Sequence, residues 1–143
     1  MSNLLSRLDE LERRFPCDPA NPFVVYCADN FHCEEADEVF RQGAYPTFEA
    51  ALAACKRMVD QELRNALRPG VLSRAAPDEL YEYYMAFGVD PFIEGPCNDR
   101  SFSACNYARA RCAEIFAPPD TGPPPSRWAK LRSLLDIHSR ASR

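Results

Sequence analysis

Glycine is scarce in this chain, which has five glycines among its 143 residues. Loops that cradle a phosphate depend on closely spaced glycines, because a backbone without side chains can approach the ligand. The sequence has no GxxxxGK[ST] or GxGxxG pattern, and it also lacks the GxSxG and HExxH patterns of common hydrolases. These absences lower the expectation of a nucleotide-using enzyme, and we expect no bound cofactor.

Long apolar segments are absent as well. No apolar run is long enough to cross a bilayer, and the first residues mix charges into their apolar pattern instead of forming a secretory signal. We therefore expect a cytoplasmic protein with no membrane partner. Cytosolic glutathione opposes disulfides and an odd number of thiols cannot pair completely, so the seven cysteines are expected to be reduced and mostly structural.

Charge is distributed unevenly along the chain, whose formal net charge is −4. Residues 118–143 hold five Arg or Lys against Asp120 and Asp136, a balance of +3, which leaves −7 for residues 1–117. Nucleic-acid binding depends on cationic neutralisation of phosphates, so an acidic body argues against a nucleic-acid partner. We expect a protein partner or a homo-oligomer, and the basic tail is a candidate binding segment.

Hydrophobic periodicity and helix-breaking residues divide the chain into segments. The β-branched and aromatic residues 23–28 favour a strand, and residues 38–45 are expected to return beside it as an antiparallel edge strand. Thr47 is the expected N-cap of the longest helix. The predicted helices cover residues 3–15, 48–66, 77–88, 101–116 and a segment near 127–138, and a third strand covers residues 89–96.

This order of elements predicts an α+β fold. We expect a small antiparallel three-stranded sheet packed on one face by the helices at 48–66 and 101–116, with additional N- and C-terminal helices. The predicted organisation is an N-terminal amphipathic helix and Pro-rich connector at 1–22, an α+β core domain at 23–116, a Pro-rich linker at 117–126 and a basic C-terminal helix or tail at 127–143. The apolar stripes of the two terminal helices are predicted to mediate self-association or docking, and folding back onto the core is the alternative.

The same spacing predicts which side chains form the core. In the helix at 77–88, Leu80, Tyr84 and Phe87 are expected inside, and Gly88 is the expected C′ residue. The thiols of Cys55, Cys105 and Cys112 occupy core-facing helix positions and could converge on a metal, but core packing predicts the same periodicity. Cys27 is expected to be an inert strand residue. The inner faces of the other two helices are expected to hold Phe48, Leu52, Cys55, Val59, Leu63 and Ala66, and Cys105, Ala108, Cys112 and Ile115.

The stretch ADNFHCEEADE at residues 28–38 is the main candidate for chemistry. His32 has neighbours with carboxylates at Asp29, Glu34 and Glu35, which suits a divalent metal site or a general acid and base. The alternative is the solvated loop of a hairpin, in which Asp29 makes the turn and the carboxylates face water. No close pair of Cys or His ligands is present, so the loop interpretation is favoured and no metal is predicted.

Aromatic residues mark two further candidate binding positions. Tyr81 and Tyr83 lie in the segment ELYEYYMAF, whose interleaved carboxylates would repel phosphate, so a protein interface is favoured over base stacking. Trp128 belongs to the apolar stripe of the C-terminal helix. The candidate binding residues are therefore Asp29, His32, Glu34, Glu35, Tyr81, Tyr83 and Trp128, and no catalytic residue is assigned.

Three short motifs carry a resemblance to a known group of proteins. They are Asp-Asn-Phe-His at 29–32, Gly-x-aromatic-x-Thr at 43–47 and FGxDPF at 87–92. With these motifs, residues 23–116 resemble a group of small bacterial proteins to which no activity is assigned. The resemblance implies the boundaries of the core domain and no mechanism, and both ends of the chain lie outside it.

Two classes of function are consistent with these features. The favoured one is a cytoplasmic accessory or protein-interaction module, for example an inhibitor or immunity-type binder of a basic partner, because the body is acidic and catalytic motifs are missing. The alternative is a small metal-dependent or hydrolytic enzyme that uses Asp29, His32 and Glu34 or Glu35. A shared concave pocket for these side chains would favour the enzyme, and side chains spread into solvent would favour the module.

Overall fold

A three-stranded antiparallel sheet forms the centre of the fold, as shown by a computed structural model that describes residues 2–29 and 39–118. The strand order is β2-β1-β3, so β1 is the central strand and pairs with both neighbours. The predicted α+β class and the predicted hairpin pairing of residues 23–28 with residues 38–45 are confirmed. The strands are β1 (Phe23–Asp29), β2 (Phe40–Tyr45) and β3 (Val89–Glu94).

The sequence of β1 matches its central position. Its first five residues, FVVYC, are all buried, because helices cover both faces of the sheet. Val25 lies opposite Gly43 of β2 and opposite Ile93 of β3. β-branched and aromatic residues pack well in such a strand, which explains why this segment has no alternation of apolar and polar residues.

A β-bulge interrupts the pairing of β1 with β2. Val25 lies opposite Gly43, but the next residue, Tyr26, lies opposite Arg41, so Gln42 is an extra residue in β2. A bulge bends the strand locally and changes the direction of its side chains. It explains why the alternation in residues 38–47 is looser than in a regular half-buried strand.

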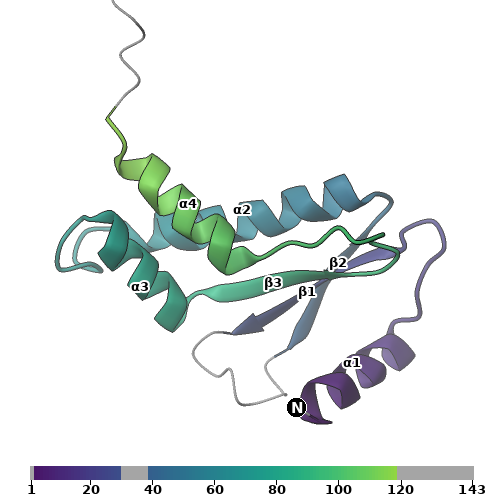
Figure 1. The fold of residues 1–143 in the computed structure, drawn as a ribbon. Coiled ribbons are helices and arrows are strands. Elements are labelled where there is room, and N and C mark those ends of the chain that lie inside the picture. The colour runs from purple at the N-terminus through teal and green to yellow at the C-terminus, as the bar shows by residue number, and fades with distance from the viewer. Residues whose placement is uncertain (1, 30–38, 119–143) are drawn as a thin grey trace, which may run out of the picture.

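Three helices lie on one side of the sheet (Figure 1). They are α2 (Phe48–Ala66), α3 (Pro77–Phe87) and α4 (Ala104–Phe116), of which α2 packs directly on the strands and α4 packs chiefly on α2 and α3. The predicted cap is confirmed, because the Thr47 hydroxyl accepts a hydrogen bond from the Ala50 N–H at 3.1 Å. The Ser103 hydroxyl caps α4 in the same way through the Asn106 N–H at 3.3 Å.

The interior on this side consists of two clusters. One joins the sheet to the first half of α2 and includes Phe23, Val25 and Phe48. The other joins α2 to α3 and α4 and includes Leu63, Leu80 and Tyr84. The predicted inner face of α2 is confirmed except at Leu52, which is only partly buried, and the small residues Ala51 and Ala54 are also buried. The buried residues of this helix are Phe48, Ala51, Ala54, Cys55, Val59, Leu63 and Ala66.

Helix α1 (Ser2–Arg14) covers the opposite face of the sheet, below the strands in Figure 1. Leu11 is buried against Val24, Tyr26 and Val39, and Leu8 packs at the edge of this cluster. The Tyr26 ring stacks on Phe92 with centroids 5.8 Å apart. In this structure the N-terminal helix therefore folds back onto its own sheet. Among the described residues, no helix combines the length and the apolar character that crossing a bilayer requires.

Two predicted core residues are exposed, and the corresponding predictions are wrong. Phe87 at the end of α3 is 53% exposed, and Ile115 in the last turn of α4 is 37% exposed. Both residues have the correct helical spacing and lie in the last turns of their helices, and in α4 the neighbouring Phe116 packs against the interior instead of Ile115. Periodicity identifies one face of a helix and does not show how far along the helix that face is covered.

The role predicted for Gly88 is also corrected. Gly88 follows α3 in an extended conformation, with φ −78° and ψ −179°, rather than in the left-handed conformation of a C′ glycine. A Cβ atom at this position would lie 2.6 Å from the carbonyl oxygen of Tyr84. Close approach of the buried Tyr84 therefore explains this glycine.

The cysteines in residues 2–29 and 39–118 are all unpaired. Cys27, Cys55 and Cys112 are buried, whereas Cys17 is exposed. Burial raises the pKa of Cys27 to about 12 and that of Cys55 to about 11, because the thiolate is poorly solvated there. These thiols behave as small apolar side chains, as predicted. Cys33 lies outside the described residues.

Candidate functional site

The outer edge of β2 is the most accessible part of the sheet. Within the described residues, β2 pairs only with β1, so N–H and C=O groups on its other side have no strand beside them. Phe40 begins this strand and is 43% exposed. An edge of this kind can pair with an added strand.

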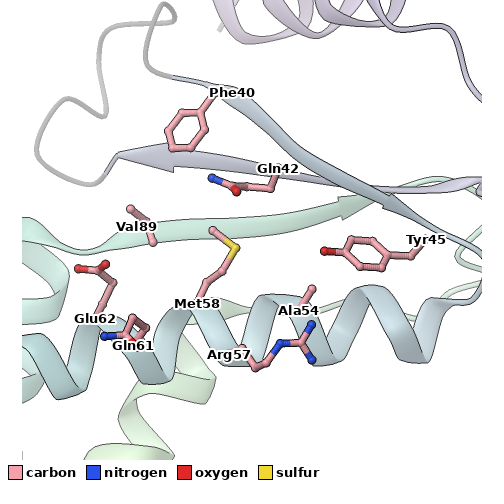
Figure 2. Close-up of a pocket in the computed structure, with 9 residues that line it drawn as sticks. All are labelled: Phe40, Gln42, Tyr45, Ala54, Arg57, Met58, Gln61, Glu62 and Val89. Atoms are coloured by element: carbon pink, nitrogen blue, oxygen red, sulfur yellow. The ribbon is translucent and has the colours of Figure 1, made fainter.

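A groove of about 390 Å³ lies between β2 and α2 (Figure 2). Phe40, Gln42 and Tyr45 of β2 project into it from above: Phe40 and Gln42 share a side by the ordinary alternation of a strand, and the extra residue of the bulge brings Tyr45 to the same side. The opposite wall is a stripe on α2, and Val89 of β3 contributes at one end. The α2 residues of the wall are Ala54, Arg57, Met58, Gln61 and Glu62.

Opposite charges lie toward different ends of this groove. Figure 2 shows Glu62 beside Val89 at one end and Arg57 beside Ala54 toward the other. Within the described part of the chain, neither Glu62 nor Arg57 forms a hydrogen bond or an ion pair. Both charges are therefore available to a bound molecule.

The position of Glu62 in the groove perturbs its carboxyl group. It is half-buried, and loss of solvation raises the pKa of its carboxyl group above the usual range. The negative charge of Asp29 adds to this increase. A cation placed here would relieve both effects, because it would replace lost solvation and offset the neighbouring negative charge.

Of the residues predicted from the loop at 28–38, the structure describes Asp29. It ends β1, opposite Val89 of β3, and its charge acts on Glu62 at the end of the groove. Asp29 also takes part in a further interaction and is not a free group. The other predicted residues, His32, Glu34, Glu35 and Trp128, lie outside the described residues.

Tyr81 and Tyr83 lie on α3, away from the groove walls, and both are half-buried. The Arg109 guanidinium lies 4.7 Å from the centre of the Tyr81 ring and donates a hydrogen bond to its hydroxyl at 3.2 Å. The Tyr83 ring packs on Phe87 with centroids 5.0 Å apart. The structure thus does not bring these tyrosines together with Asp29 in one site.

Residues 2–29 and 39–118 contain no group of three His, Cys, Asp or Glu side chains arranged to hold a metal ion. Sequence reasoning missed Phe40, Met58 and Glu62. A signal for the α2 wall was present, because Ala54, Met58 and Glu62 recur every fourth residue beside the buried stripe. A signal for the β2 wall was the loose alternation around Gln42.

Comparison of the chain with models of protein families, with curated proteins and with solved structures found no match. The resemblance of residues 23–116 to the group of small bacterial proteins therefore stays a prediction.

Proposed function

We propose that this protein is a cytoplasmic, non-catalytic interaction module that binds an extended segment of another protein along the open edge of β2. One observation carries the proposal: this edge lies next to a groove that can receive side chains of an added strand. In strand addition, main-chain hydrogen bonds supply affinity, and pockets for alternate side chains supply specificity. The β2 edge offers main-chain groups for hydrogen bonds, and the β2–α2 groove offers a pocket for side chains.

A contrast between the two edges of the sheet supports the choice of β2. The edge strand β3 contains Pro91, which cannot donate a ladder hydrogen bond, and the carboxylates Asp90 and Glu94. Proline and charged residues are common protection against unwanted strand pairing. β2, with the sequence FRQGAY, has no proline and no acidic residue, so it is less protected than β3, although it does carry Arg41 and a bulge at Gln42.

Net charge supports a basic protein as the partner. Residues 1–117 carry −7 in the sequence, and the groove contains a half-buried carboxylate at Glu62. The negative charge of this protein speeds association with a basic partner and disfavours binding to other acidic chains. For the same reason it makes a nucleic-acid partner unfavourable. An inhibitor or immunity-type binder of a basic protein is one form that such a module would take.

Selection of short random peptides tests this function. Peptides selected on the intact protein are expected to protect the backbone amides of residues 40–45 in hydrogen-exchange mass spectrometry, because an added strand pairs with them. Phe40→Lys places a charge at the groove mouth and is expected to weaken binding by about tenfold. Glu94→Lys is the matched control, since it adds a lysine to the edge strand β3 and is expected to leave binding unchanged.

Other results would contradict this assignment. Protection of backbone amides only in β3 or α3 would exclude β2 as the binding edge. Equal effects of the two lysine variants on peptide binding would exclude it as well. Protection of residues 40–45 that grows with protein concentration in the absence of peptide would identify a second copy of the chain as the occupant. Protection that a chain ending at Phe116 loses would identify the C-terminal segment of the same chain instead.

A further inference from the structure

The axial spacing of Arg57 and Glu62 on α2 is close to the repeat of an extended chain, and the two residues lie about 140° apart around the helix. The two residues are five positions apart on α2, and at the helical rise this is about 7.5 Å along the axis. Residues i and i+2 of a strand are separated by about 6.8 Å and point to the same face. Along this axis, two successive groove-facing side chains of a strand on β2 are spaced like Arg57 and Glu62, both of which line the groove.

We propose that the groove selects a strand with an acidic and a basic side chain two residues apart, in which the acidic one meets Arg57 and the basic one meets Glu62. This inference rests on the proposed function, because it requires an added strand on β2. It assigns the chemical class of the ligand, an extended peptide with a charged pair, to a groove that also contacts apolar side chains.

The order of the two charges follows from strand direction. β2 runs from Phe40, at the Glu62 end of the groove, to Tyr45, at the Arg57 end (Figure 2). An antiparallel strand would enter at the Arg57 end and leave at the Glu62 end, and antiparallel pairing is the more stable arrangement. The selected pattern is thus acidic-x-basic from the N-terminus to the C-terminus of the bound segment.

The surroundings of Glu62 suit a Lys or Arg side chain. Phe40 and Met58 line the groove between the strand and the carboxylate, so they would contact the aliphatic part of such a side chain. Its charged end would then replace the lost solvation of Glu62 and offset the field of Asp29. Because Glu62 is half-buried, this contact is screened less than a surface ion pair.

Arg57 would make the weaker of the two contacts. Its side chain is exposed and lies near the groove wall formed by Ala54 and Tyr45. A guanidinium can bind a carboxylate through two parallel hydrogen bonds, but solvent competes at an exposed position. The basic side chain of the ligand is therefore expected to matter more than the acidic one.

Four synthetic peptides with one Val/Thr host sequence test this selectivity. They carry Glu-x-Lys, Lys-x-Glu, Lys-x-Lys or Glu-x-Glu at two central positions that face the same side of a strand. The intact protein is expected to bind the Glu-x-Lys peptide about fivefold more tightly than the Lys-x-Glu peptide. The Glu-x-Glu peptide is expected to bind most weakly, because it places a carboxylate opposite Glu62.

A charge exchange in the groove gives the decisive comparison. The double variant Arg57→Glu with Glu62→Lys is expected to prefer the Lys-x-Glu peptide. The matched control is Arg68→Glu with Glu82→Lys, which exchanges two exposed charges outside the groove and is expected to keep the original preference.

The outcomes separate this inference from the proposed function. Equal binding of the four peptides, with protection of residues 40–45, would overturn the charge selectivity and leave strand addition intact. A preference that the charge exchange does not reverse would overturn the assigned residues. Failure of every peptide to bind, from this set and from random selection, would overturn strand addition together with the inference.

Discussion

The six cysteines that the structure describes are all free, but they have different surroundings. Cys27 lies in the central strand and Cys55 in the middle of α2, and both are buried, whereas Cys17 is exposed before the sheet begins. The pKa of Cys27 is raised to about 12 first by burial and then by the negative charge of Asp90. A thiol reacts as its thiolate, so both burial and the raised pKa protect Cys27 and Cys55.

Alkylation of the folded protein should therefore discriminate among these thiols. In mildly alkaline buffer, Cys17 is expected to react rapidly because it is exposed, while Cys27 and Cys55 are expected to react only after unfolding. Peptide mapping after a short treatment with iodoacetamide measures the difference, and the same treatment in denaturant is the control. Comparable labelling of Cys17 and Cys27 in the folded protein would show that β1 is not buried as described.

Among the elements, α1 makes the least extensive contact with the sheet. Its contact rests on Leu11, which is 6% exposed, with Leu8 at the edge of the cluster. Leu5 on the same helix is 68% exposed. The sequence predicted an apolar stripe that needs a partner, and the second face of the sheet, with Val24 and Tyr26, serves as that partner for α1.

Two leucine variants test the position of α1. Leu11→Ala removes a buried side chain and is expected to lower the free energy of unfolding by about 2 kcal/mol. Leu5→Ala changes an exposed side chain of the same type and is expected to change it by less than about 0.5 kcal/mol. Urea denaturation measures both values. Equal effects would contradict the docking of α1 on the sheet through Leu11.

Element boundaries that depend on local chemistry were predicted closely. The helix at 48–66 begins after Thr47 as predicted, whereas α4 begins after Ser103 and not at the predicted residue 101. In both helices the hydroxyl caps a backbone N–H that would otherwise lack a partner. Exposure at the helix ends was not predicted, as Phe87 and Ile115 show. It depends on which side of the last turn the neighbouring elements contact, as the packing of Phe116 beside the exposed Ile115 shows, and local spacing has no information on this.

At the scale of the whole molecule, an acidic body is joined to a basic C-terminal segment. Residues 1–117 carry −7 and residues 118–143 carry +3. Opposite charges on one chain favour docking in cis or between copies, although salt screens such contacts. The part of the predicted self-association that concerns residues 127–143 lies outside the described residues and stays a prediction.

Sedimentation and thermal unfolding of the intact protein, compared with a chain ending at Phe116, test this role of the tail. We expect the shorter chain to differ, with a smaller sedimenting mass if the tail joins two copies, or a lower midpoint of unfolding if it docks on its own body. The difference should shrink at high salt because the attraction is electrostatic. Identical behaviour of the two chains would contradict both forms of docking.

The candidate site was only partly accessible to sequence reasoning. Asp29 was recognised for its carboxylate and does act on Glu62, but the sequence predicted a role for it together with His32 in the loop. The groove instead combines Phe40, Glu62 and Val89, which are far apart in the chain. No local pattern connects three such residues, because their proximity depends on strand order and on the position of α2.

The sequence by itself determined the α+β class, the order of the elements and most of their inner faces. These features follow from hydrophobic periodicity, β-branched residues, prolines and caps, all of which act over a few neighbouring residues. Only the tertiary structure decided that β2 and β3 lie on opposite sides of β1, that α1 covers the second face, and that an open edge borders a groove. The reason is physical: local interactions select helix or strand, whereas an edge, a covered face or a groove exists only when distant segments pack together.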